Sequence, residues 1–246
     1  MKEKRVLLIR KNESYLVKVG QGIFNTRSGT INLSELVKKK IGEEIETHLG
    51  KKFRIVEPNL KDFFEKAFKR GAQVILPKDA ALILAYTGIK SNSKVIDAGT
   101  GTGYLAIFLA NYLSEGKVIT YEKDERFIKI AEENIKLSGL KNIILKKKDV
   151  TKGFDEKNVD LVTLDLKDVK KVINHAFKAL KFGGFLAIYC PTVDELLEVL
   201  DEIENFSFSK PVIIESIVRE WKYEKTLRPK TKGLMHTGFL IFTRKV

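Results

Sequence analysis

The glycine-rich segment Asp97–Gly103 is the part of the sequence best suited to hold a ligand. A short strand is predicted over Lys94–Ala98, glycines follow at 99, 101 and 103, and an apolar helix is predicted over Tyr104–Leu113. Glycine lets the chain turn sharply between a strand and a helix, and it leaves room for a ligand against the backbone. We therefore expect Gly99, Gly101, Thr102 and Gly103 to line a binding site.

Carboxylates close three of the predicted strands. Asp97 lies beside the glycine loop, Glu122 ends the next strand, and Asp149 lies just past the third. Glu122 is placed to accept hydrogen bonds from both ribose hydroxyls of an adenosine, and Asp149 from an adenine amino group. Asp97 would repel a pyrophosphate and attract a cationic amino group. These charges favour S-adenosylmethionine over a dinucleotide as the bound cofactor.

Two alternatives remain for the glycine loop. Gly101, Gly103 and Ala106 satisfy the dinucleotide pattern G-x-G-x-x-A, so an NAD-dependent oxidoreductase is possible, although no acid/base pair for hydride transfer is evident. The other alternative is a tight strand-to-helix turn without any ligand.

Strands and helices alternate from about residue 90 onward. This alternation predicts an α/β, Rossmann-like domain with a mostly parallel sheet. No helix is predicted between the last two strands, so one strand of the sheet should be antiparallel. The predicted strands cover 94–98, 117–122, 143–147, 159–165, 184–189, 212–219 and 238–244, and the predicted helices cover 104–113, 124–139, 169–180 and 193–204.

The N-terminal region has a different character. Short β-rich pieces at 5–10, 14–19, 29–33 and 53–56 predict a small β-domain. Asn59 is expected to cap a helix that runs to Arg70. We therefore expect three parts: a β-rich domain over residues 1–58, a helical connector over 59–90 and a cofactor-binding domain over 91–246.

Composition and charge narrow the possible partners. The 246 residues carry a net charge of +13, which favours a phosphate-bearing partner such as a nucleic acid, although solvated lysine-rich faces are common. No apolar run is long enough to cross a membrane. One cysteine, Cys190, allows no intramolecular disulfide, and one cysteine with three histidines argues against a Cys/His metal site. We expect a cytoplasmic protein without a metal.

Further motifs point to a particular family. Together with Asp97–Gly103 and Glu122, the segment Leu180–Leu186 resembles the class I S-adenosylmethionine methyltransferases. The chain more narrowly resembles the tRNA adenine-N1 methyltransferases that modify position 58 of the T-loop. This narrower resemblance depends on the stretches Gln73–Ala80, Leu164–Leu166, Leu227–Pro229 and His236–Leu240. It implies a seven-stranded sheet with one antiparallel strand, a small N-terminal β-domain, a homotetramer, and tRNA as the substrate.

The reaction implied by this resemblance needs a carboxylate beside the target base. N1 of adenine attacks through its own lone pair and becomes cationic, so nearby negative charge and correct orientation help. Asp165, expected at the end of the fourth strand, is the candidate catalytic residue and also borders the cofactor. Asp160 is the alternative acid, although it opens that strand. Tyr189 is a second catalytic candidate, because its ring could stack on the base.

The sequence departs from the family at two places that border the base. Many relatives carry an aromatic residue where this chain has Leu76, which could still pack against a purine. Many also follow Leu-Asp-Leu with a proline and an aromatic, where this chain has Lys167-Asp168-Val169. A methyltransferase of the same fold acting on another RNA, a protein or a small molecule is therefore the alternative function, and a non-catalytic RNA-binding module is another.

The segment Arg219–Lys232 combines basic and aromatic side chains. Such a mixture can hold phosphates and stack an extruded base. The expected RNA contacts are Leu76, Lys78, Lys222, Lys225 and Arg228. The alternative is a solvated arm whose Trp221 is buried at a subunit contact. We expect His236 to be structural and Cys190 to be a buried, inert thiol.

Overall fold

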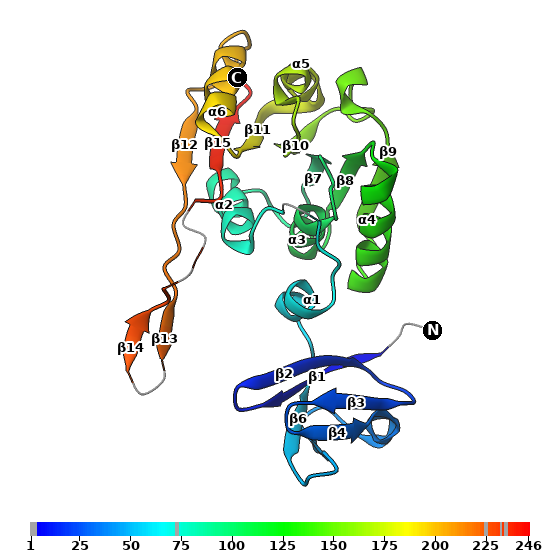
Figure 1. The fold of residues 1–246 in the computed structure, drawn as a ribbon. Coiled ribbons are helices and arrows are strands. Elements are labelled where there is room, and N and C mark those ends of the chain that lie inside the picture. Colours follow the sequence, from blue (N-terminus) through cyan, green and yellow to red (C-terminus); the bar gives the residue numbers. More distant parts are fainter. Residues whose placement is uncertain (1–3, 72–73, 224–225, 232, 234–235) are drawn as a thin grey trace. The chain divides into compact units, whose positions relative to one another are not determined.

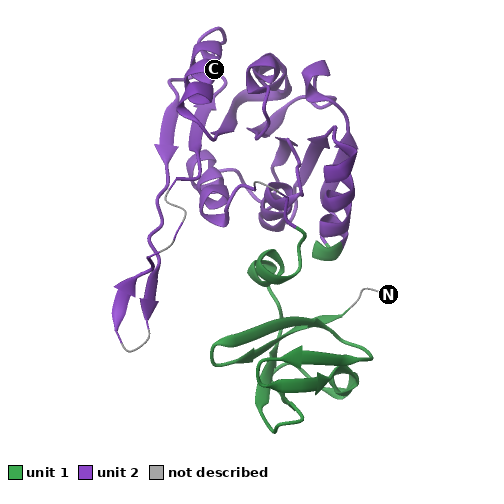
Figure 2. Ribbon diagram, viewed as in Figure 1, with its two compact units in different colours: residues 1–69, 137–139 green, residues 70–136, 140–246 purple. Residues whose placement is uncertain are grey.

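The computed structural model describes residues 4–71, 74–223, 226–231, 233 and 236–246. Contacts divide the chain into two units, which Figure 2 colours separately: residues 1–69 with 137–139, and residues 70–136 with 140–246. The boundaries expected at 58 and 90 stay a prediction.

The N-terminal unit is a small β-domain. Its four-stranded sheet has the order β2-β1-β6-β5, and β3 pairs with β4 in a separate hairpin. Alternate residues of these strands enclose a core that includes Leu8, Ile31 and Phe53. The strands are β1 (Arg5–Arg10), β2 (Glu13–Lys18), β3 (Ile23–Thr26), β4 (Gly29–Asn32), β5 (Glu44–Glu46) and β6 (Lys52–Val56), with a 3-10 helix at Leu33–Lys38. The short strands β3 and β5 were not predicted.

Helix α1 (Leu60–Lys66) ends this unit. Asn59 caps it as predicted, because its side chain accepts from the Asp62 N–H while the Asp62 carboxylate accepts from the Asn59 N–H. The predicted extension to Arg70 is wrong, since the helix ends at Lys66.

The larger unit is built on a seven-stranded sheet in the order β12-β15-β11-β10-β7-β8-β9 (Figure 1). Only β15 is antiparallel to its neighbours, so the predicted α/β sheet is confirmed. The strands are β7 (Lys94–Ala98), β8 (Lys117–Glu122), β9 (Ile143–Lys147), β10 (Val159–Leu164), β11 (Leu180–Cys190), β12 (Val212–Glu215) and β15 (Phe239–Arg244).

Helices cover both faces of this sheet. Neighbouring residues of one strand point to opposite faces, so Ile96 packs in a cluster with α5 and α6, while Val95 packs in a cluster with α2 and α3. The helices are α2 (Pro77–Thr87), α3 (Tyr104–Tyr112), α4 (Glu125–Ser138), α5 (Val169–Ala179) and α6 (Val193–Ile203), with a 3-10 turn at Val150–Lys152. No helix in the described ranges is long and apolar enough to cross a membrane.

The connection between β12 and β15 carries a small hairpin of its own. The strand predicted over Val212–Arg219 is wrong beyond Glu215, where β12 ends. The strands β13 (Trp221–Tyr223) and β14 (Leu227–Pro229) then pair with each other outside the main sheet. We call this β13–β14 hairpin the arm; Figure 1 shows it beyond the end of β12.

Candidate functional site

The turn after β7 has the geometry that the glycines predicted. Gly99, Gly101 and Gly103 have φ angles of +88°, +52° and +83°, which residues other than glycine rarely adopt. A Cβ on Gly99 would lie 1.8 Å from the Asp165 carbonyl oxygen, so glycine lets two strand ends approach closely. A Cβ on Gly101 would meet nothing nearer than 3.9 Å. The space beside Gly101 is therefore open to a ligand.

Asp97 forms the floor of this turn. It lies in register with Thr120 on β8 and Thr163 on β10, and their hydroxyls donate to its carboxylate at 2.6 and 2.7 Å. Only 1% of Asp97 is exposed. Burial raises its pKa to about 6, although the two hydroxyls lower it and the Glu122 charge raises it further. The two threonines were not predicted as site residues; a polar residue inside each otherwise apolar strand was the available sign.

Glu122 holds the glycine turn from the adjacent strand end. One carboxylate oxygen accepts from the Gly101 N–H at 2.9 Å, and the other accepts from the N–H groups of Lys123 and Asp124 at 2.9 and 3.0 Å. The expected strand-end carboxylate thus lies beside the loop, within reach of a ligand placed on it.

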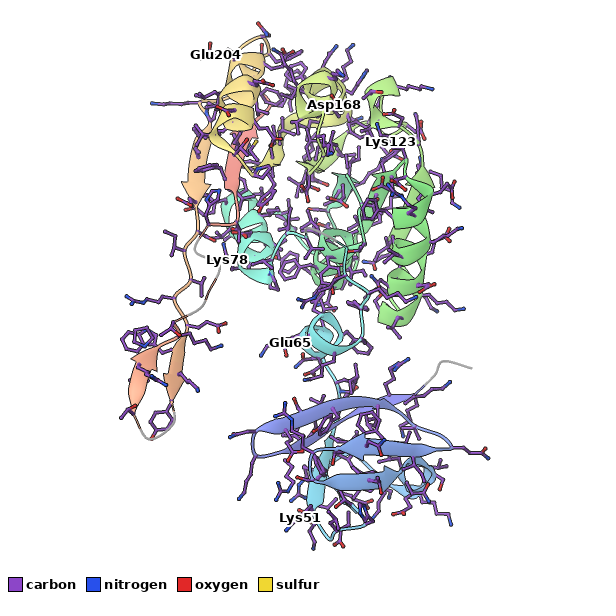
Figure 3. All side chains as sticks on the ribbon, in the orientation of Figure 1. Lys51, Glu65, Lys78, Lys123, Asp168 and Glu204 are labelled. Atoms are coloured by element: carbon purple, nitrogen blue, oxygen red, sulfur yellow. The ribbon has the colours of Figure 1, made fainter. Side chains whose placement is uncertain are left out.

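Asp149 follows β9 at the same sheet edge. Its carboxylate accepts from the Thr151 N–H at 3.0 Å and the Thr151 hydroxyl at 2.9 Å, and these hydrogen bonds lower its pKa. The Lys123 ammonium lies 3.5 Å away; Figure 3 labels Lys123 in this region. Asp149 is therefore an ionised acceptor close to Glu122's strand.

Asp165 follows β10 and faces the glycine turn. Its N–H donates to the Ala98 carbonyl at 2.9 Å, which joins the ends of β10 and β7. Burial, together with the charges of Asp97 and Glu195, raises its pKa to about 7. The site therefore concentrates negative charge at one point of the sheet edge. Glu195, in the first turn of α6, was not predicted, and it lines a cavity of about 160 Å³ with Lys167 and Asp168.

The alternative acid Asp160 lies at the opposite sheet edge, as its place at the start of β10 indicated. It accepts from the Lys94 N–H at 2.7 Å and pairs with Lys181. A larger cavity of about 570 Å³ lies there, lined in part by Asp160, Lys181 and Arg244. None of the predicted cofactor residues lines that cavity.

Three other predicted residues occupy less accessible places. Tyr189 is 5% exposed, packs in the core with α2 and α3, and donates its hydroxyl hydrogen bond to the Thr237 carbonyl. Lys78 is turned inward and contacts Asp79, Ser216 and Thr237. Leu76 is half-buried at the start of α2. The predicted contacts of Tyr189 with the base and of Leu76 and Lys78 with RNA stay predictions.

The arm presents basic and aromatic side chains. Lys222 and Arg228 lie opposite each other in the β13–β14 register, and both are exposed. Trp221 and Tyr223 are 54% and 83% exposed. Lys225, also expected to bind RNA, lies outside the described residues.

Known proteins share both the sequence and the fold. A family model described as a methyltransferase domain matches residues 89–228. A tRNA (adenine(57)-N(1)/adenine(58)-N(1))-methyltransferase TrmI from Methanocaldococcus jannaschii is 32% identical, covering 98% of this chain and 94% of its own. The tRNA (adenine(58)-N(1))-methyltransferase TrmI of Thermus thermophilus is 31% identical over 96% of this chain and 94% of its own. The chain belongs to the TrmI family of methyltransferases.

Solved structures agree with this family assignment. TrmI from Aquifex aeolicus, titled as a tRNA (m1A58) methyltransferase, superposes with a TM-score of 0.85 at 26% identity and covers 100% of this chain and 98% of its own. A Thermotoga maritima protein titled as a SAM-dependent O-methyltransferase has a TM-score of 0.91 at 36% identity, with coverages of 100% and 94%. The predicted family and the predicted methyltransferase activity are therefore confirmed.

Proposed function

We propose that this TrmI-family enzyme methylates N1 of adenine in the T-loop of tRNA, at position 58 and, as a second target, position 57. The archaeal relative is named for methylation of adenines 57 and 58, and the bacterial relative for methylation of adenine 58. The observation that carries the proposal is the half-buried Asp165 carboxylate at the end of β10, beside the glycine turn and Asp97. We further propose a homotetramer that works in the cytoplasm.

The residues of the glycine turn fit S-adenosylmethionine. The open space beside Gly101 admits a ligand against the backbone, Glu122 is placed for ribose hydroxyls, and Asp149 for the adenine amino group. Buried Asp97 supplies negative charge beneath the loop, which attracts the amino group of a methionine moiety and would oppose a pyrophosphate. Gly99, Thr102 and Gly103 complete the turn. When bound, this cofactor supplies an electrophilic methyl group.

Asp165 orients the target base and offsets its developing charge. Its carboxylate accepts a hydrogen bond from the exocyclic amino group, which places N1 toward the methyl donor. N1 uses its own lone pair, so no base has to remove a proton first. The product adenine is cationic, and the ionised carboxylate stabilises that charge in the low-dielectric surroundings. With a pKa of about 7, Asp165 becomes mostly ionised above neutral pH.

The arm supplies the RNA contact. Lys222 and Arg228 lie opposite each other on the arm and both are exposed, so a single phosphate backbone can contact both cations. Exposed Trp221 and Tyr223 offer faces on which bases stack. A stacked adenine must leave its stack before N1 can react, at about a few kcal/mol. Phosphate contacts by the arm help offset that free energy.

Nucleoside mass spectrometry tests this function. Unmodified tRNA is incubated with enzyme and S-adenosylmethionine, and the same is done with transcripts in which A58 or A57 is replaced by guanosine. We expect 1-methyladenosine in the unchanged tRNA, strongly reduced by the A58 replacement. If the unchanged tRNA yields no 1-methyladenosine, the proposal is overturned.

O-methylation is the second candidate, because the Thermotoga maritima relative is titled as an O-methyltransferase. The same digests distinguish it, since 2′-O-methylated nucleosides have different retention and fragmentation. A panel of small hydroxylated acceptors without RNA completes the comparison. Methyl transfer to such acceptors at rates above those for tRNA would favour this candidate.

A further inference from the structure

A buried polar cluster joins three distant segments of the chain. The Lys78 ammonium lies 2.8 Å from an Asp79 carboxylate oxygen, 2.6 Å from the Ser216 hydroxyl and 2.8 Å from the Thr237 hydroxyl. It also lies 2.8 Å from the Ser216 carbonyl oxygen. Asp79 is 1% exposed and the Lys78 side chain 15%. Lys78 and Asp79 begin α2, Ser216 follows β12, and Thr237 precedes β15. We call these four residues the clasp.

The hydrogen bonds within the clasp are mutually consistent. The Ser216 and Thr237 hydroxyls donate to the two Asp79 carboxylate oxygens at 2.6 and 2.9 Å, and both hydroxyl oxygens accept from Lys78. Each hydroxyl thus acts as donor and acceptor at once. Because Asp79 and Thr237 are buried, removing one member of the clasp leaves polar groups to which water cannot readily donate or accept hydrogen bonds.

The clasp lies where the arm leaves the sheet. In the sheet register Phe239, the first residue of β15, pairs with Cys190 and with Glu215, the last residues of β11 and β12. Ser216 and Thr237 are therefore the outgoing and returning ends of the connection that carries the arm. β11 is parallel to β10, so this is also the sheet edge of Asp165. Figure 3 labels Lys78 beside these ends.

A second set of contacts secures the same place. His236 contacts a Glu215 carboxylate oxygen at 2.5 Å through Nδ1 and the Pro191 carbonyl at 3.0 Å through Nε2. The Tyr189 hydroxyl donates to the Thr237 carbonyl, and a Cβ on Gly238 would lie 2.6 Å from the Tyr189 ring. Both ends of the connection are thus attached to the strand ends, and the clasp attaches them to α2.

We propose that Lys78 and Asp79 are positioning residues that hold the base of the arm against α2 and so set the affinity for tRNA. The inference rests on the proposed function, in which the arm contacts RNA. Neither residue touches the cofactor site described above. Their substitution should therefore act on the arm's order and on the KM for tRNA, with little effect on cofactor affinity or on kcat at saturating tRNA.

Matched variants of Thr237 test the clasp with little change of shape. Thr237→Val removes the hydroxyl and keeps the volume, whereas Thr237→Ser keeps the hydroxyl. Asp79→Asn removes the charge that Lys78 faces. Lys146→Met is the control, because Lys146 lies on β9, away from the arm, and its substitution removes a partly buried ion pair with Glu156. Melting curves of all variants identify any that fail to fold.

Trp221 reports on the arm directly, because it is the single tryptophan of the sequence and lies on β13. Time-resolved fluorescence anisotropy measures its nanosecond motion. We expect Thr237→Val and Asp79→Asn to increase the amplitude of that motion and to raise the KM for tRNA about tenfold. Thr237→Ser and Lys146→Met should behave like the unsubstituted protein.

Two results separate the possible failures. If Thr237→Val lowers the melting temperature but leaves both the anisotropy decay and the KM for tRNA unchanged, the clasp is merely structural and the inference is overturned. If the unsubstituted enzyme does not methylate tRNA, the proposed function fails, while the anisotropy data still show whether the clasp orders the arm.

Discussion

The glycine turn at the ends of β7, β8 and β10 and the arm between β12 and β15 use charge in opposite ways. At the glycine turn, Asp97 and Asp165 are carboxylates whose pKa values are raised by burial. On the arm, Lys222 and Arg228 are exposed cations opposite each other. A buried negative charge interacts strongly with a bound group, and salt screens that interaction little. Each exposed positive charge interacts more weakly, and salt screens its interactions.

This difference fits the different tasks proposed for the two regions. A small cofactor must be bound in one orientation, which suits groups fixed by backbone and threonine hydrogen bonds. A large RNA is held by many weak phosphate contacts, which suits a projecting arm in a chain of net charge +13. Substitutions at the glycine turn should therefore have large, salt-independent effects on binding or rate, and substitutions on the arm should have smaller, salt-dependent effects.

The largest effect on ligand affinity is expected for Asp97→Asn. The amide keeps the shape of the side chain but removes the buried charge beneath the glycine turn, so affinity for S-adenosylhomocysteine should fall by roughly 100-fold, as for loss of a charged hydrogen bond. Isothermal titration calorimetry measures this affinity. Glu204→Gln, at the end of α6, is the matched control. If Asp97→Asn binds S-adenosylhomocysteine with unchanged affinity, Asp97 does not contribute to cofactor binding.

Asp165→Asn should lower kcat by about 100-fold or more while cofactor affinity stays within a few-fold, because its charge acts on the developing cation. The unsubstituted enzyme should gain activity as pH rises through about 7, where Asp165 ionises. That rise should be absent in the residual activity of Asp165→Asn. Single-turnover rates at several pH values measure both. A full rate in the variant would contradict this role.

A smaller effect is expected for the double substitution of Lys222 and Arg228 by alanine. The Kd for tRNA should rise about tenfold, and the slope of log affinity against log salt should become shallower by about two, one for each lost phosphate contact. Lys230→Ala is the control, since Lys230 is paired with Glu220. An unchanged salt slope would place the RNA surface elsewhere.

The smallest effect concerns stability. The folded-state pKa values of Asp97 and Asp165 lie above their ordinary values near 3.8, so the folded protein holds these protons more tightly than the unfolded chain. Stability from Asp165 is present below about pH 4 and is lost as pH rises through about 7. Asp165→Asn should thus melt progressively higher than the unsubstituted protein between pH 4 and 8, by about 2–4 °C for each kcal/mol gained. Calorimetry at several pH values measures both melting temperatures. If the variant and the unsubstituted protein differ by the same amount at every pH, the prediction is wrong.

Much of the fold and part of the site were predictable because local signals were strong there. Glycines 99, 101 and 103 adopt the positive φ angles that their spacing indicated. Asp97 and Glu122 lie in the last two positions of their strands and Asp165 directly follows its strand, and apolar runs defined all three strands. The ends of β12 and α1 were predicted too late, because their sequences continue with residues that favour the same structure. The short strands β3 and β5 lack a long alternating run.

The amino-acid sequence by itself determined the strand and helix order, the glycine turn and the acids at the strand ends, since these depend on neighbours within a few positions. Only the tertiary structure decided three contacts: Thr120 and Thr163 both donate to the Asp97 carboxylate, the Tyr189 hydroxyl donates to the Thr237 carbonyl, and Lys78 faces inward. Those contacts join residues up to 159 positions apart. Sheet register and helix packing bring such residues together, and no local sequence pattern predicts which of them will be in contact.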